Sequence, residues 1–218
     1  MNGVHSHTAA TGGGMPPAME GFEHVNRYWD KTNNTYAAKI LPGEFYVTRN
    51  RGELITTVLG SCISVCIRDP LSGIGGMNHF MLPVDSKQNG AWGATVAAST
   101  RYGTYAMEQL INRILQGGGN RNRFEIKVFG GGRVMSGVTD VGKKNIAFIH
   151  HYLKVEGFEL LAQDVGDVYP RKVLYFPSTG RVRLKKLRAM HNDTIIQRER
   201  AYFDELADEP VQGEIELF

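Results

Sequence analysis

Residues 56–67 have the sequence TTVLGSCISVCI, in which small and β-branched side chains predominate. This composition predicts a buried β-strand, which we place at residues 54–68. Alternation along the strand puts a mostly β-branched face in the core and leaves Cys62 on a face of small residues. We therefore expect the Cys62 thiol to be open to approach by another group, and Cys66 in the middle of the strand to be a core residue.

The remainder of the chain alternates between predicted strands and helices. Strands are expected at residues 44–48, 74–82, 124–129, 158–163, 172–176 and 181–187. Helices are expected at residues 99–116, 141–155 and 193–207. In the first two, apolar residues recur at helical spacing and glycine follows the last turn. The pattern predicts a single α/β domain in which these two helices pack outside the β layers.

Composition separates the flanking segments from this domain. Residues 1–21 are rich in glycine, alanine, threonine and proline, which is typical of a disordered tail. Residues 22–43 contain aromatic residues without a clear period and are interpreted as an irregular N-terminal arm. Residues 208–218 are interpreted as an acidic C-terminal tail, which leaves residues 44–207 as the folded domain.

Composition and charge exclude several classes of function. The 218 residues are 42% hydrophobic and 22% charged, and the formal net charge is +3. This charge is too small for a nucleic-acid-binding protein, and the basic residues within 181–188 are interpreted as the solvated side of a strand. No apolar run approaches the ~20 residues that span a bilayer, and the N-terminus lacks the features of a secretory signal. We therefore expect a cytoplasmic protein without membrane insertion.

The two cysteines of the chain exclude other kinds of site. Four strand positions separate the α-carbons of Cys62 and Cys66 by roughly 13 Å, whereas a disulfide needs about 7 Å or less. Two cysteines and scattered histidines do not form a zinc framework. The glycines at Gly130–Gly132 are not followed by the Gly-Lys-Ser/Thr of a phosphate-binding loop. We therefore expect free thiols, no metal, no cofactor, and a tight turn at these glycines.

His79 lies in the sequence GGMNHFMLP, residues 75–83, where glycines and apolar neighbours indicate a partly desolvated pocket. A thiol and an imidazole on neighbouring strands can form a nucleophile and its base, and an ion pair between them lowers the pKa of the thiol. Backbone N–H groups beside Cys62 can stabilise an oxyanion. The strands offer no Asp or Asn to orient the imidazole, so the hydroxyl of Thr56 or Thr57 is the candidate for that contact.

Both residues also have ordinary structural interpretations. A free cysteine is most often a small buried hydrophobe. A single histidine on a strand is more often a hydrogen-bonded structural residue than a base. The residues alone therefore leave open whether Cys62 and His79 form a site for acyl or amide chemistry.

Several short motifs occur together in this chain. They are LGSC at 59–62, DP at 69–70, HFMLP at 79–83, RYG at 101–103, KVFGG at 127–131 and KNI at 144–146. In combination, over residues 40–187, they resemble the CheD family of chemoreceptor glutamine deamidases. The resemblance implies a layered sandwich of β-sheets with the catalytic deamidase domain at residues 44–207. It also implies Cys62 as the nucleophile, His79 as the general base and acid, and Thr56 as the group that orients His79.

The resemblance further implies a reaction and its partners. Cys62 would attack the carboxamide of a glutamine side chain, and the resulting thioester would be hydrolysed to glutamate with release of ammonia. The implied substrates are chemoreceptors (methyl-accepting chemotaxis proteins), and a CheC-type phosphatase is an implied docking partner. Two alternatives stay open: another cysteine amidase or peptidase, because the pocket sets the substrate, and a non-enzymatic adaptor that binds chemotaxis signalling proteins.

Overall fold

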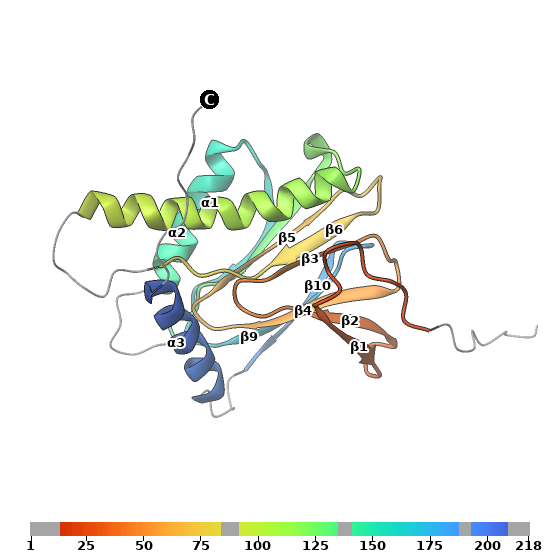
Figure 1. The fold of residues 1–218 in the computed structure, drawn as a ribbon, viewed down its shortest axis with the longest axis horizontal. Helices are drawn as coiled ribbons and strands as arrows, with labels where there is room; N and C mark the ends of the chain where they lie inside the picture. Colours follow the sequence, from red (N-terminus) through yellow and green to blue (C-terminus); the bar gives the residue numbers. More distant parts are fainter. Residues whose placement is uncertain (1–13, 84–91, 135–140, 188–192, 209–218) are drawn as a thin grey trace, which may run out of the picture.

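In residues 14–83, 92–134, 141–187 and 193–208, which this computed structural model describes, two five-stranded β-sheets are surrounded by three α-helices (Figure 1). The first sheet has the strand order β1 (Asn26–Asp30), β2 (Thr35–Lys39), β4 (Glu53–Leu59), β9 (Arg171–Phe176) and β10 (Arg181–Lys186). The second has the order β3 (Phe45–Thr48), β6 (Gly75–Asn78), β5 (Ile63–Arg68), β7 (Glu125–Gly130) and β8 (Leu160–Val165). The predicted α/β sandwich of packed sheets is confirmed.

The helices are distributed unequally over the two sheets. α1 (Trp92–Gln116) packs against β3 and β6, and α2 (Val141–Val155) packs against β5, so both cover the second sheet (Figure 1). α3 (Asp193–Asp208) lies at one end of the sheets, and η1 (Arg121–Arg123) is a short 3-10 turn before β7. α2 has the predicted bounds, whereas the helix expected to start at residue 99 begins at Trp92.

The chain passes from one sheet to the other between β4 and β5. Each of these strands is the central strand of its sheet, and residues 60–62 join them. The prediction of one continuous strand over residues 54–68 is therefore wrong. The extended backbone is interrupted at Gly60, where the chain leaves the first layer and enters the second. The strand predicted at residues 74–82 also ends early, at Asn78, one residue before His79.

The segment 22–43 is not an irregular arm, because β1 and β2 form an antiparallel hairpin whose second strand pairs in parallel with β4. Asp30 closes this hairpin by accepting hydrogen bonds from the backbone N–H groups of Thr32 and Asn33. Both strands are only five residues long, and neither the mostly exposed edge strand β1 nor the half-buried β2 alternates regularly between buried and exposed side chains, so their sequence shows no clear period. The folded domain therefore begins before residue 44.

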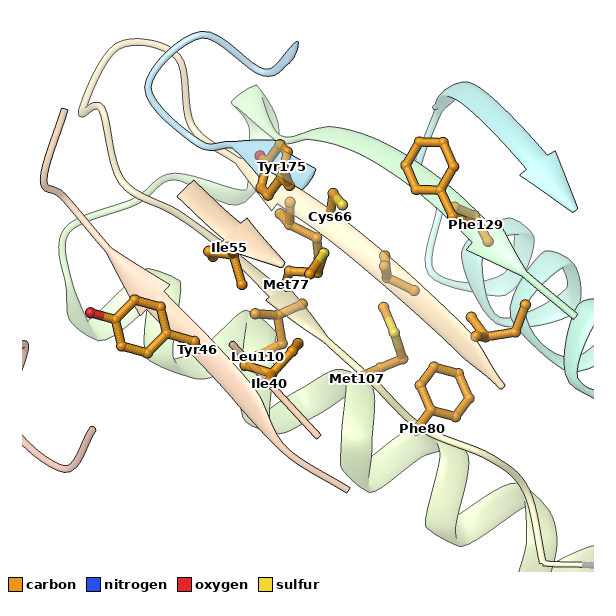
Figure 2. Close-up of a cluster of buried hydrophobic side chains, with 14 of the residues drawn as sticks. Ile40, Tyr46, Ile55, Cys66, Met77, Phe80, Met107, Leu110, Phe129 and Tyr175 are labelled. Atoms are coloured by element: carbon orange, nitrogen blue, oxygen red, sulfur yellow. The ribbon is translucent and has the colours of Figure 1, made fainter. Parts of the chain in front are cut away.

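The hydrophobic core draws side chains from both sheets and from the helices that cover them (Figure 2). Ile55 and Tyr175 come from the first sheet, and Met77 and Cys66 come from the second. Cys66 is fully buried, as predicted, and both cysteines are free thiols. The basic side chains of β10 alternate with half-buried apolar ones, so the predicted solvated face of this strand is also confirmed.

Parts of the expected tails lie outside the described residues, namely residues 1–13 and 209–218. Within the expected N-terminal tail, Ala18 and Met19 pack against the core, which places at least this part of the segment on the domain. No helix in the described ranges combines the length and the apolar character needed to cross a membrane.

Candidate active site

Cys62 is the last residue of the turn between β4 and β5, and a glycine-rich segment after β7 holds this turn in place. The N–H of Gly131 donates to the carbonyl of Cys62 at 2.8 Å, and the N–H of Gly132 donates to the carbonyl of Gly60 at 2.7 Å. Gly130 has a φ of 112°, and a β-carbon there would collide with the Cys62 carbonyl. The predicted tight turn is not found, because Gly130 ends β7 and residues 131–134 continue without a hydrogen-bonded turn; instead, the N–H groups of Gly131 and Gly132 bind carbonyls of the Cys62 turn.

Asn145 of α2 holds the remaining carbonyl of the Cys62 turn. Its Nδ2 donates to the carbonyl of Ser61 at 2.8 Å, and its Oδ1 accepts from the N–H of Leu82 at 2.9 Å. Asn145 is fully buried, so this one amide ties the Cys62 turn to the segment that follows His79. Sequence reasoning did not identify this role, because a single asparagine in a helix gives no signal of its partners.

The N–H groups of the Cys62 turn converge on one carboxylate, that of Glu199 in α3. The N–H groups of Gly60 and Ser61 each donate to it at 2.7 Å, and the N–H of Cys62 donates at 3.3 Å. The Ser61 hydroxyl adds a fourth hydrogen bond of 2.7 Å, and Glu199 is only 2% exposed. Because the carbonyls of the turn are held elsewhere, its N–H groups are fixed as donors, which is the arrangement expected of an oxyanion-binding site.

His79 directly follows β6, and its imidazole is held by Thr57 of β4. Nδ1 of His79 lies 2.8 Å from Oγ1 of Thr57, and this hydroxyl donates its one hydrogen to the carbonyl of Ile40 at 2.8 Å. Nδ1 must therefore carry a hydrogen and donate it to Thr57, because a carbonyl can only accept. This tautomer leaves a free lone pair on Nε2, which is buried and has no hydrogen-bond partner among the described residues.

Thr56, which was expected to orient His79, makes a different contact. Its hydroxyl donates to the carbonyl of Val173 in β9 at 2.9 Å. Consecutive residues of a strand face opposite sides, and Thr57 shares the side of Ile55, which lies in the core. The contact expected from Thr56 is therefore corrected to Thr57, the alternative that the residues alone had left open.

Cys62 and His79 lie at the ends of neighbouring strands, as predicted. Ile63 and Phe80, the next residues in the chain, exchange two backbone hydrogen bonds of 2.9 Å. Cys62 and His79 are thus diagonal neighbours across an antiparallel pair, and such residues share a face of the sheet within reach of long side chains. In the conformation described, no hydrogen bond joins Nε2 of His79 to the Cys62 sulfur.

Burial controls the ionisation of both groups. Burial raises the pKa of the Cys62 thiol well above its ordinary value, and the negative charge of Glu199 raises it further. Burial, together with a smaller effect of the positive charge of Arg198 in α3, lowers the pKa of His79 to about 3. The expected thiolate–imidazolium pair with a lowered thiol pKa is therefore not found, because the buried environment favours the neutral form of each group.

The site thus contains a buried thiol, a neutral imidazole with a free nitrogen, and three converging N–H donors. These are the parts of a nucleophilic site for carbonyl chemistry. In the ranges that the structure describes, no cluster of three or more His, Cys, Asp or Glu side chains is suited to hold a metal ion.

Fold and site together define an α/β sandwich protein with a cysteine–histidine pair where the chain crosses between sheets. A family model described as "CheD chemotactic sensory transduction" matches residues 81–186, which include Asn145 but not Cys62 or His79. A solved structure titled "Crystal structure of Bacillus licheniformis hypothetical protein YfiH" aligns with 48% of this chain and 33% of its own, at 14% identity and a TM-score of 0.28, which is too weak to support a common fold.

Curated relatives match nearly the whole chain. A "Probable chemoreceptor glutamine deamidase CheD" of Halorhodospira halophila is 55% identical over 205 residues, which cover 94% of each chain. Proteins of the same name from Hahella chejuensis and Hydrogenovibrio crunogenus are 52% and 54% identical and cover 93% and 83% of this chain, and 95% and 93% of their own. This chain belongs to the CheD family.

Proposed function

We propose that this protein deamidates glutamine side chains of chemotaxis receptors to glutamate, with Cys62 as the nucleophile. The names of the relatives describe this activity for those proteins, and identity above 50% over most of the chain supports the same activity here. The observation that carries the proposal is the buried Nε2 of His79 near Cys62, which has no hydrogen-bond partner in the part of the chain that the structure describes. An imidazole held through Nδ1 alone is suited to a general base, and a purely structural histidine has no need of a free nitrogen.

The reaction uses groups that the structure holds in place. Nε2 of His79 removes the thiol proton of Cys62, and the sulfur attacks the carboxamide carbon of the substrate. The N–H groups of the Cys62 turn bind the oxyanion of the tetrahedral intermediate. The imidazolium then gives its proton to the leaving nitrogen, so that ammonia departs and a thioester remains. Water, deprotonated by the same nitrogen, hydrolyses the thioester to glutamate and restores the thiol.

Thr57 is the positioning residue of this mechanism. By accepting the hydrogen bond from Nδ1, it keeps the lone pair on Nε2, where the proton transfers occur. We also propose the location and partner that accompany this function. The cytoplasm is where thiols stay reduced, and a CheC-type phosphatase is the docking partner that family membership suggests.

The proposal is tested with purified protein and the cytoplasmic fragment of a receptor from the same source. Mass spectrometry should show glutamines converted to glutamates, with ammonia released in equal amount, and Cys62→Ala should abolish both. Binding of the fragment without conversion would favour the adaptor alternative. Release of ammonia from free glutamine or short amides, but not from the receptor, would favour another cysteine amidase.

A further inference from the structure

Helix α3 carries a carboxylate in the middle of its buried side. The partly or fully buried side chains of this helix recur at helical spacing, and they are Ile195, Ile196, Glu199, Tyr202, Phe203 and Leu206. Glu199 is the only one of these six that carries a charge. Burying a carboxylate is costly unless it is hydrogen-bonded, and the four donors of the Cys62 turn satisfy it.

The pocket that receives this carboxylate belongs to the sheets and not to α3. A β-carbon on Gly60 would lie 2.6 Å from Oε2 of Glu199 and 2.7 Å from its Cδ, so the absence of a side chain at position 60 makes the space. Gly131, Gly132 and Asn145 hold the carbonyls of the turn from the other side. The donors are therefore arranged independently of α3, and they suit the oxygens of a carboxylate or the carbonyl oxygen of a carboxamide.

Tyr202 and Leu206 pack α3 against the rest of the domain beside the same pocket. The hydroxyl of Tyr202 is hydrogen-bonded to that of Tyr102 in α1, and its ring lies against the backbone at Gly43. Leu206, one turn further along, is 8% exposed. A helical segment of the chain thus closes over the pocket, and Cys62 and His79 are 0% and 2% exposed beneath it.

On the function proposed above, the product of the reaction is a glutamate side chain whose carboxylate leaves the oxyanion-binding donors. Glu199 has the same side chain as that product, and its carboxylate is hydrogen-bonded to those donors. We propose that α3 occupies the substrate site of its own chain, with Glu199 held as the glutamate product is held, and that a receptor segment displaces α3 before Cys62 reacts. This inference rests on the proposed deamidase function and adds an internal competitor to it.

The charges of α3 agree with a resting state of the site. The carboxylate of Glu199 raises the pKa of Cys62, and the neighbouring Arg198 lowers the pKa of His79. The charge of Glu199 therefore favours the protonated, less nucleophilic form of Cys62, and the charge of Arg198 disfavours the imidazolium that His79 becomes when it takes up the thiol proton. Release of α3 removes both charges and part of the burial.

The first test makes the helix a substrate. Glu199→Gln places a carboxamide where the carboxylate lies, and attack by Cys62 followed by hydrolysis of the thioester would consume one water, release one ammonia and restore glutamate. We expect mass spectrometry of the purified full-length variant to show glutamate regained at position 199. The exposed Gln197 of the same helix is the internal control and should stay unchanged. The double variant with Cys62→Ala should keep the introduced amide.

The second test removes the competitor. In Glu199→Ala, alkylation of Cys62 by iodoacetamide should accelerate, and KM for the receptor fragment should fall, each by about tenfold, since charge-assisted hydrogen bonds hold α3 in place. Glu205→Ala, at an exposed position of the same helix, is the matched control and should behave like the wild type. Circular dichroism of both variants should match that of the wild type.

The outcomes separate the two proposals. If the wild type converts receptor glutamines, but Glu199→Gln keeps its amide and Glu199→Ala changes neither labelling nor KM, the role of α3 is refuted and the deamidase function stands. A different result would be faster labelling of Cys62 in Glu199→Ala, with no glutamine converted either in the receptor or at position 199. In that case α3 only shields Cys62 from solvent, and both the deamidase function and the product-like binding of Glu199 are refuted.

Discussion

Oγ1 of Thr57 in the first sheet and Nδ1 of His79 beside the second sheet are joined by a 2.8 Å hydrogen bond. The hydrogen of the Thr57 hydroxyl is committed to Ile40, so the contact selects one imidazole tautomer. Thr56 has the same side chain and the same 3% exposure but bonds to Val173. The two adjacent threonines therefore form a matched pair that separates an effect on the base from an effect on stability.

Replacing each threonine with valine tests this assignment. Thr57→Val removes the acceptor for Nδ1, so we expect kcat to fall by about 100-fold with little change in KM, within the range that a positioned general base contributes. Thr56→Val should leave kcat unchanged and lower the free energy of unfolding by about 1 kcal/mol, the usual value of one hydrogen bond. Steady-state ammonia release and urea unfolding give the two quantities. A loss of kcat in Thr56→Val alone would restore the assignment that family resemblance implied.

The two cysteines form a second pair. Cys62→Ala should abolish deamidation without changing the fold, whereas Cys66→Ala should keep its activity and lower the free energy of unfolding by about 1 kcal/mol, a typical cost for a core substitution. Cys66 lies within the core (Figure 2), in the middle of β5, where it pairs with Met77 of β6 and Lys127 of β7. An inactive but folded Cys66→Ala protein would contradict these roles.

Asn145→Ala should destabilise the protein and loosen the site. The substitution leaves the buried carbonyl of Ser61 and N–H of Leu82 without partners, so we expect a loss of about 3 kcal/mol in the free energy of unfolding. Asn122→Ala, at an exposed position, should change the free energy of unfolding by less than about 0.5 kcal/mol. Urea denaturation measures both, and equal stability of the two variants would show that Asn145 does not hold the turn.

His79 should make stability depend on pH. Its pKa is lowered from 6.5 to about 3 in the folded protein, so the unfolded chain takes up a proton first as the pH falls. The contribution of His79 is fully present above pH 6.5 and is lost as the pH falls toward 3, at up to about 1.4 kcal/mol per pH unit. Unfolding of His79→Gln should lack this dependence, whereas the exposed-site control His24→Gln should keep it. Parallel curves for wild type and His79→Gln would show that the imidazole takes up its proton at the same pH in the folded and the unfolded chain.

Elements with a strong local pattern could be predicted from the sequence. Helix α2 has its apolar residues at helical spacing and a glycine after its end, and it is found at residues 141–155 as expected. Cys66 was placed correctly because its neighbours are β-branched. The hairpin of β1 and β2 was missed, because in these five-residue strands buried and exposed side chains do not alternate regularly.

The site was less predictable because its contacts join segments far apart in the chain. The break at Gly60 decides which face each residue of β4 presents, and the sequence alone did not separate Thr57 from Thr56. The pairing of Glu199 with the Cys62 turn spans 137 to 139 positions. A signal did exist, since a lone glutamate interrupts the apolar side of α3, but it does not reveal the partner.

Because the chain crosses from one sheet to the other between β4 and β5, the packing of the two sheets affects the position of the His79 imidazole. Thr57, which accepts the hydrogen bond from the imidazole, belongs to the first sheet, and the backbone of His79 follows a strand of the second, so the alignment of the two residues depends on how the sheets are stacked. A smaller side chain at Ile55 or Met77, which lie in the core, would let the layers shift and impair turnover before the protein unfolds. Catalytic competence is in this sense a property of the interlayer packing.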